Sequence, residues 1–219
     1  MIAQDLIQID ITPLTPKDKV GDALREMEDL GMHHWPIVQE TLYEGLISED
    51  AALDADENDT IESLRQRFIL SNVEMESHLF DAVRKYGEER ISILPVIDGD
   101  KKYVGYILPQ DVLHAIGGLF SLQAPGSVLV LEVNQYDYSM AQIAQIVESN
   151  DAKILATYMH VNQDKGLFEV TIRINFTDLS PIIASFERYE YVVAQAWHEN
   201  RYEQDLKQRF DQFMNYLNM

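Results

Sequence analysis

The first half of the chain contains an internal repeat, which restricts the fold because equivalent segments adopt equivalent structures that pack on one another. Three short apolar runs recur in the same order, two at an offset of 59 residues and the third at 60. The matched runs are 20–24 (VGDAL) with 79–83 (LFDAV), 34–38 (HWPIV) with 93–97 (ILPVI), and 45–47 (GLI) with 105–107 (GYI). The additional residue falls in the hairpin turn predicted at 98–100.

Each repeat unit has the pattern of a β-α-β-β-α fold, with β-prone pieces predicted at 11–14 and 72–74. Apolar residues at helical spacing follow each piece, then two β runs, then a short helix at 50–53 or 111–116. A unit of about sixty residues buries little apolar surface alone. We therefore expect units 1–55 and 60–120 to pack together as one domain over 1–122.

An acidic segment, 54–59, lies between the two units. A calcium loop starting at Asp54 needs Gly at its sixth position and Glu at its twelfth, where this sequence has Asp59 and Arg65. The segment is interpreted as a solvated linker, with calcium binding as the alternative. Asp59 and Glu62 have the spacing of a helix-start capping pattern.

Glycine and proline at 117–118 and 124–126 predict a domain boundary, and a different pattern follows. The expected elements are a strand at 127–133, a helix at 140–147, strands at 154–161 and 167–176, a helix capped by Asp178 and reaching about 188, and a strand at 191–197. The order β-α-β-β-α-β predicts a ferredoxin-like sandwich over 126–198. The whole chain is thus of mixed α/β (α+β) class.

The last segment, 199–219, is predicted to be an amphipathic helix. Its apolar residues recur at helical spacing and are Tyr202, Leu206, Phe210, Phe213, Met214 and Leu217. A stripe with two phenylalanines is costly in water, so the helix is expected to dock. Its own chain or a sister subunit is the favoured acceptor, and a regulated partner protein is the alternative.

Charge excludes several classes of partner. With 17 basic and 37 acidic side chains the formal net charge is −20, which opposes binding to nucleic acid and to anionic membrane surfaces. There is no cysteine, hence no disulfide and no thiolate chemistry. The start of the chain lacks the features of a secretory signal, and no run approaches about 18 apolar residues. We expect a soluble, cytoplasmic protein.

The repeated unit resembles the cystathionine-β-synthase (CBS) domain, which occurs in tandem pairs called Bateman modules. The resemblance rests on residues 94–98 (LPVID) and 105–111 (GYILPQD), with 35–38 (WPIV) and 45–50 (GLISED) in the first unit. The second half looks like an ACT domain by its order of elements. A CBS pair followed by an ACT-like domain is similar to the acetoin-utilisation accessory proteins.

The resemblance implies a regulatory ligand of the AMP, ADP or ATP type and no cofactor. In nucleotide-binding CBS domains a hydroxyl after the Gly-led strand contacts phosphate, and an Asp three residues later binds the ribose hydroxyls. Here Asp111 has the ribose position but Leu108 replaces the hydroxyl, whereas Ser48 supplies the hydroxyl but Ala51 replaces the Asp. The residues that the resemblance assigns to ligand binding are Asp111, Ile93, Leu94, Pro95, Pro109, Ser48, Trp35 and Pro36.

Several of these residues have a second, structural interpretation. Asp111 and Ser48 are also typical helix N-caps, and Asp50, one residue early for the ribose position, is interpreted only as a cap. Trp35 at the adenine-flanking position either stacks on a base or belongs to the core or a dimer interface.

Other polar residues give weaker signals. His33 and His34 are adjacent and point to opposite faces of a strand, so together they do not chelate one ion. The basic residues Arg84, Lys85, Arg90, Lys101 and Lys102 are interpreted as a solvated surface. No catalytic motif is found. The turn at 134–139, where ACT domains bind amino acids, has no Gly, so Asp137 or Ser139 is expected to cap the next helix instead.

These observations favour a non-enzymatic module that senses an adenine nucleotide through its CBS pair and signals to a partner protein. The alternative is a structural adaptor whose ligand clefts are vestigial and which serves dimerisation and docking. A homodimer is expected in both cases, formed through the ACT-like domain. An enzyme is the least favoured interpretation.

Overall fold

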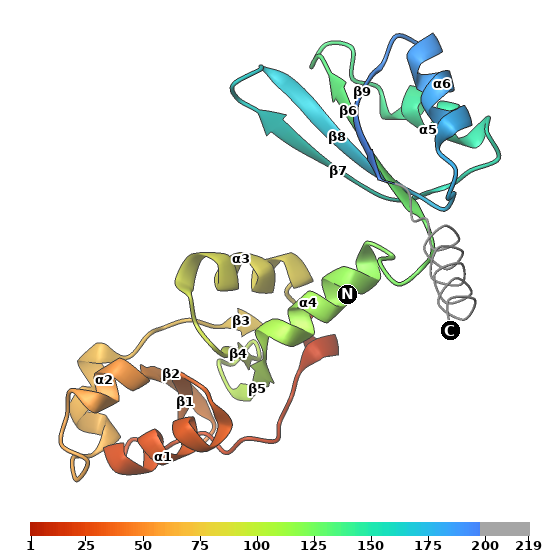
Figure 1. Cartoon of the computed structure of the whole chain (residues 1–219). Helices are drawn as coiled ribbons and strands as arrows, with labels where there is room; N and C mark the ends of the chain where they lie inside the picture. Colours follow the sequence, from red (N-terminus) through yellow and green to blue (C-terminus); the bar gives the residue numbers. More distant parts are fainter. Residues whose placement is uncertain (198–219) are drawn as a thin grey trace, which may run out of the picture. The chain divides into compact units, whose positions relative to one another are not determined.

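A computed structural model describes residues 1–197 of the chain, and the helix predicted over 199–219 lies outside the described residues. Contacts divide the chain into two compact units, Met1–Ala115 and one beginning at Ile116. The domain bounds that the sequence suggests, 122 and 126, stay predictions. The chain is of mixed α/β class, as expected (Figure 1). None of the helices within residues 1–197 is long and apolar enough to cross a membrane.

The repeat is visible in the elements of the first half. The first copy contains α1 (Val20–Leu30), β1 (His34–Gln39), β2 (Leu42–Ser48) and α2 (Glu49–Leu53), and the second contains β3 (Val73–Glu74), α3 (Leu79–Glu89), β4 (Leu94–Ile97), β5 (Tyr103–Ile107) and α4 (Pro109–Leu119). Two 3₁₀ helices, η1 (Ala3–Leu6) and η2 (Ile61–Arg67), precede the copies. The predicted helices and hairpins are confirmed, whereas the β-prone piece at 11–14 contributes only a single bridge, between Leu14 and Ile37.

Each copy has an antiparallel hairpin, and the tips of the two hairpins bond to each other. The Tyr43 N–H donates to Lys101 O at 3.1 Å, and the Tyr103 N–H donates to Thr41 O at 2.8 Å. The two tyrosine rings are stacked with centroids 6.5 Å apart. These equivalent bonds join the two copies in a pseudo-symmetric pair, as expected for units that bury little apolar surface alone.

Several predicted helix caps differ from the structure in detail. The segment after the linker is a 3₁₀ helix whose N-cap is Thr60, so the Asp59 capping prediction is wrong. In α6 the N-cap is Leu179, which makes no side-chain cap bond, while Asp178 accepts from the Ser180 N–H at 3.0 Å. Asp178 therefore stabilises the helix start from one residue further out than the N-cap position.

The second unit forms the predicted order β-α-β-β-α-β. Its elements are β6 (Ser127–Val133), α5 (Met140–Glu148), β7 (Ile154–Asn162), β8 (Leu167–Ile174), α6 (Ser180–Arg188) and β9 (Val192–Trp197). The strands form one antiparallel sheet in the order β7-β8-β6-β9, which is the ferredoxin-like arrangement. A core of alternate strand residues, such as Leu129, Leu131 and Ile172, packs against Ile143 and Phe186 of the two helices.

Candidate functional site

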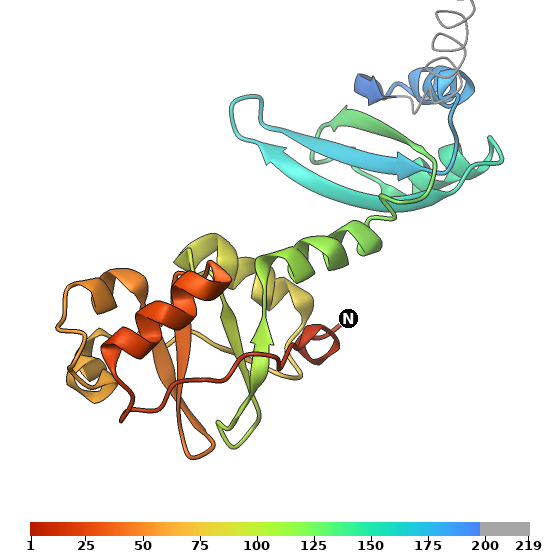
Figure 2. The same cartoon turned by 60° about the horizontal axis from the view of Figure 1, so that its bottom comes forward.

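Two equivalent corners of the first unit carry the residues that the repeat predicted. Each lies where a glycine-led strand, β2 or β5, ends and a helix, α2 or α4, begins. A flanking segment runs along each strand: Ile69 and Leu46 exchange two backbone bonds of 2.9 Å, and Gln8 and Tyr106 exchange bonds of 2.8 and 3.0 Å. The segment before the first copy thus pairs with the second copy, and the segment before the second copy pairs with the first (Figure 2).

The glycines of the repeated motif permit this close approach. A Cβ atom on Gly105 would lie 2.5 Å from the Gln8 carbonyl oxygen, and one on Gly45 would lie 3.0 Å from the Phe68 Cβ. Real Cβ atoms do not tolerate the first distance, so the backbone of the flanking segment excludes a side chain there. The glycines therefore admit the segments that border the two corners.

Ser48 is the N-cap of α2 in the first corner. Its Oγ accepts from the Ala51 N–H at 3.2 Å, which is the usual role of a serine in this position. The interpretation of Asp50 as the cap is wrong, because Asp50 is the second residue of the helix and Ser48 has the capping position. The serine side chain is half-buried.

Asp111 lies in the second corner as the third residue of α4, so the N-cap interpretation of this residue is also wrong. Its Oδ2 accepts from the Leu108 N–H at 3.0 Å and from the Gln8 Nε2 at 2.8 Å. The carboxylate stabilises the helix start from inside the first turn, as the third residue of a capping box does. Its bond with Gln8 also ties the flanking segment to the corner.

A second carboxylate supports the same segment. Asp10 accepts a hydrogen bond from the hydroxyl of Tyr106, whose side chain is almost fully buried. Burial raises the pKa of Tyr106, and the hydrogen bond to Asp10 raises it further, so the phenol remains a donor at neutral pH. The second corner thus has two carboxylates, Asp111 bonded to Gln8 and Asp10 bonded to Tyr106, the two residues that the β-bridge pairs.

Each flanking segment also exposes one large apolar side chain. Ile9 is 78% exposed and Leu70 is 76% exposed, and they follow the two bridging residues at equivalent positions. Sequence reasoning missed Gln8, Ile9, Asp10 and Leu70. The signal that could have found them is the repeat itself, because Gln8 and Ile69 precede their own copies at nearly the repeat offset.

The other predicted ligand residues are mostly buried. Trp35 is fully buried and its Nε1 donates to Thr12 O at 3.1 Å, so the indole has the core role rather than the stacking role. The two central prolines are also buried, whereas the proline that begins α4 is exposed. The buried residues are Trp35, Pro36, Ile93, Leu94 and Pro95, and the exposed one is Pro109.

The histidines have local partners. His34 Nδ1 accepts from the Ser92 N–H at 3.2 Å, and burial lowers its pKa, with His33 as a further cause. His33 Nδ1 lies 2.5 Å from a Glu49 carboxylate oxygen. Within residues 1–197 no group of three or more His, Asp or Glu side chains is placed to hold a metal ion.

The predicted basic surface consists largely of local ion pairs. Arg84 pairs with Asp81 and Glu88 along α3, Lys85 pairs with Glu89, and Lys102 pairs with Asp100 in the turn. Local pairing of this kind leaves little positive field for an anionic ligand. A separate depression of about 660 Å³ between α1 and α2 is lined by charges of both signs, including Lys19, Asp22, Arg25, Glu28, Glu49 and Glu57.

The turn after the first strand of the second unit is capped as expected. Ser139 is the N-cap of α5 and its Oγ accepts from the Gln142 N–H at 3.3 Å. A depression of about 470 Å³ adjoins this turn and is lined by Asn134, Asp137 and Gln142, among others. Gln142 also accepts from the hydroxyl of Tyr191 at 2.9 Å. The tyrosine and the cap serine thus both anchor the start of α5.

Both repeat units match one family of known proteins. Residues 3–68 and 72–118, more than half of the chain, match the family described as CBS domain. A CBS domain pair/ACT domain protein from Thermotoga maritima is 19% identical, with 53% of this chain and 96% of that chain covered and a TM-score of 0.49. CBSX2 in complex with AMP is 22% identical, with 56% and 96% covered and a TM-score of 0.43.

Proposed function

Because this chain belongs to the CBS-domain family, we propose that its paired repeats form a non-enzymatic regulatory module that binds an adenine nucleotide, of the AMP, ADP or ATP type, and passes the bound state to a partner protein. The observation that carries the proposal is the pair of equivalent corners, each with a polar group at a helix start and an exposed apolar residue in the flanking segment that borders it. A protein gains by covering such apolar surface, and the flat face of a purine suits it.

In the second corner the available side chains suit contact with the sugar of the nucleotide. We assign the ribose hydroxyls to the Asp111 carboxylate, which has lone pairs beyond those used by Leu108 and Gln8. The base lies against Ile9. Leu108 supplies no hydroxyl for the phosphate, so this corner contributes sugar and base contacts, whereas Ser48 supplies the hydroxyl of the first corner.

We propose further that the second unit is an ACT-like domain and that the whole chain is similar to the acetoin-utilisation accessory proteins. The support is the order of its elements and the strand order β7-β8-β6-β9. Its role in this proposal is to join two copies of the chain in a cytoplasmic homodimer.

A second candidate function is a structural adaptor with vestigial ligand sites. One observation favours it: the polar groups of both corners already have partners within the chain, Ala51 for Ser48, and Leu108 and Gln8 for Asp111. In that case the protein serves dimerisation and the docking of a partner, without sensing a ligand.

Calorimetry and thermal shift with AMP, ADP, ATP, S-adenosylmethionine and the common amino acids separate these functions. A nucleotide at about 100 times its Kd is expected to stabilise the protein by about 2.7 kcal/mol. Absence of any shift at millimolar nucleotide would favour the adaptor.

Substitutions with different expected effects on nucleotide affinity test the site. Asp111→Ala is expected to weaken nucleotide binding at least tenfold, whereas Gln8→Ala is expected to leave it unchanged or tighter, because the ribose and the Gln8 amide share the carboxylate. Ile9→Ala is expected to weaken binding, with Leu30→Ala as the matched control for an exposed apolar residue elsewhere. Equal affinity in Asp111→Ala and the parent protein would place the ligand at another site.

A further inference from the structure

The four-stranded sheet of the second unit has its two described helices on one face only. In Figures 1 and 2, α5 and α6 lie on the same side of the sheet. Successive side chains of β6 point to opposite faces of the sheet. Leu129 and Leu131 lie in the core under the helices, so Val130 and Glu132 point to the other face. We call that other side the open face.

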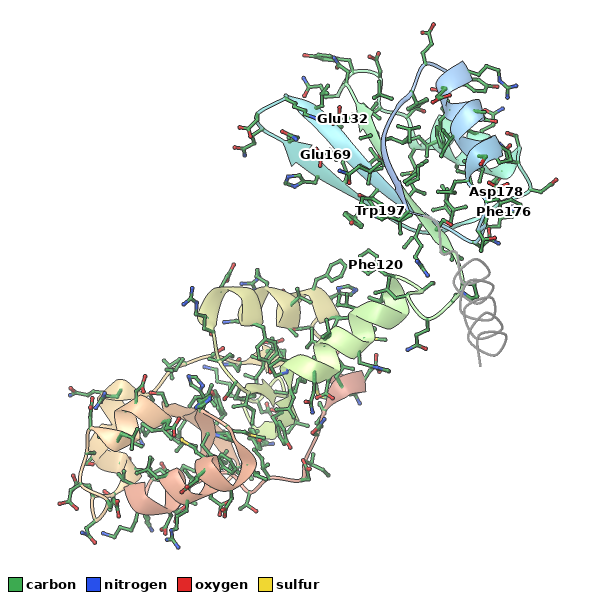
Figure 3. The ribbon with its side chains drawn as sticks, viewed as in Figure 1. Phe120, Glu132, Glu169, Phe176, Asp178 and Trp197 are labelled. Atoms are coloured by element: carbon green, nitrogen blue, oxygen red, sulfur yellow. The ribbon has the colours of Figure 1, made fainter. Side chains whose placement is uncertain are left out.

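The strand register defines the rest of the open face. Val130 pairs with Thr171 of β8 and Gln195 of β9, and Thr171 pairs in turn with Tyr158 of β7. A depression of about 420 Å³ lies over these residues and extends to Trp197. Figure 3 shows the positions of Trp197 and the two glutamates of the sheet in this unit.

The described part of the chain covers one end of this face. Phe120 meets the Tyr158 ring edge-to-face with centroids 5.9 Å apart, and Arg173 donates to the carbonyls of Ser121 and Ala124. This contact covers Tyr158 only in part, and its side chain is still 54% exposed. Trp197, the other large aromatic residue on this face, is 53% exposed. A sheet face with such residues is stabilised by a covering layer.

The open face also contains two glutamates that repel each other. Glu132 and Glu169 are directly paired across β6 and β8, an arrangement that destabilises neighbouring strands unless cations compensate it. Lys165 pairs with Glu132, and Asn162 donates to Glu169 at 2.7 Å. One lysine serves this pair within residues 1–197, so a covering element with additional positive charge is favoured.

We propose that the chain's own C-terminal segment, residues 198–219, is this covering element and packs as a helix across the open face. It follows directly on Trp197, which ends β9 on this face. Residues 202–217 as a helix are about 24 Å long, close to the roughly 23 Å of the seven-residue strand β6. The length therefore suits one passage over the sheet.

The sequence of the segment also fits the face. At about 100° per residue, the apolar residues from Tyr202 to Leu217 share one side of the helix, and Lys207 and Arg209 flank that side on its two edges. The apolar stripe is thus placed to meet Tyr158, Val130 and Trp197. Because the two cations lie on opposite edges, one of them faces the glutamate pair whichever way the helix runs. The segment also contains Glu199, Glu203, Asp205 and Asp211, so the favourable charge is local to these cations and is not a net positive charge.

Tryptophan fluorescence tests the proposal in the full-length chain. The protein has two tryptophans, and Trp35 is fully buried in the first unit, so the difference between the parent and Trp197→Phe isolates the signal of Trp197. In the parent that signal is expected to be blue-shifted and at least threefold less quenchable by iodide or acrylamide than in a chain ending at Trp197. Trp35 emission monitors folding of both.

Substitutions within the segment test the same proposal without shortening the chain. Phe213→Asp on the apolar stripe is expected to expose Trp197, and Gln212→Asp on the other side of the helix is the matched control. Lys207→Glu with Arg209→Glu is expected to expose Trp197, and adding Glu132→Lys with Glu169→Lys is expected to restore protection. Equal quenching of Trp197 in the parent and the truncated chain would overturn the proposal, as would protection that rises with protein concentration, which would indicate a second copy.

Discussion

Gly105 shows how one residue controls the second corner of the CBS pair. A side chain at this position would collide with the Gln8 carbonyl and with Ile7, whose Cγ2 would also be 2.5 Å away. The same motif position in the first copy, Gly45, leaves more room, since its nearest neighbour would be a side-chain carbon at 3.0 Å. A side chain at this motif position is therefore tolerated less well in the second copy than in the first.

We predict that Gly105→Ala destabilises the protein by about 1–3 kcal/mol, because the flanking segment must move out of contact. Gly45→Ala is expected to cost less. Gly87→Ala is the control: Gly87 lies in α3, and among residues 1–197 no atom would lie within 4 Å of an added Cβ. Ala there is expected to stabilise by about 0.5–1 kcal/mol. Urea unfolding measures all three, and a Gly105→Ala protein as stable as the parent would contradict the close approach.

At the scale of elements, the starts of the helices combine stability with the proposed ligand contacts. Ser48 caps α2 and Ser139 caps α5 by the same bond, yet only Ser48 lies in a corner of the repeat. Because Asp is as good an N-cap as Ser but carries a negative charge, substitution by Asp separates the two roles of Ser48.

We predict that Ser48→Ala lowers stability by about 1 kcal/mol, and that Ser48→Asp retains stability but weakens nucleotide binding by charge repulsion with phosphate. Ser139→Ala is expected to lower stability similarly and leave nucleotide affinity unchanged. Thermal unfolding and calorimetry on the same samples give both quantities. Parent-like affinity in Ser48→Asp would show that no phosphate lies beside this serine.

At the scale of the whole molecule, β7 is an edge of the four-stranded sheet, and its side chains from 157 to 161 are exposed. Tyr158, Met159 and Val161 give this edge a large apolar content. Exposed edge strands of this kind pair readily with a second chain. This edge is therefore the surface that we favour for the homodimer.

We predict that the full-length protein sediments as a dimer and that Met159→Asp with Val161→Asp shifts it to a monomer with unchanged circular dichroism. Leu42→Asp, at a comparably exposed position of the first unit, is the control and is expected to remain dimeric. A monomeric parent would refute the homodimer, and a dimer that survives the edge substitutions would refute the choice of β7.

The sequence by itself determined the elements and their pairing into a repeat. Apolar periodicity marked α1 and α3, the matched runs marked two hairpins, and the order after residue 126 predicted the ferredoxin-like sheet. The individual elements are local, because each depends on the spacing of residues within about ten positions, which is what periodicity reports. The repeat is found by comparing such local patterns across 59–60 residues.

Tertiary structure alone decided which segment borders which corner. The reciprocal exchange, Gln8 with Tyr106 and Ile69 with Leu46, joins residues far apart in the chain, and no local pattern specifies it. For the same reason the sequence left Asp111 between a ribose contact and an N-cap, and Trp35 between two roles. Long-range packing placed Asp111 inside the first turn against Gln8 and buried Trp35, because burial depends on what the rest of the chain brings to a site.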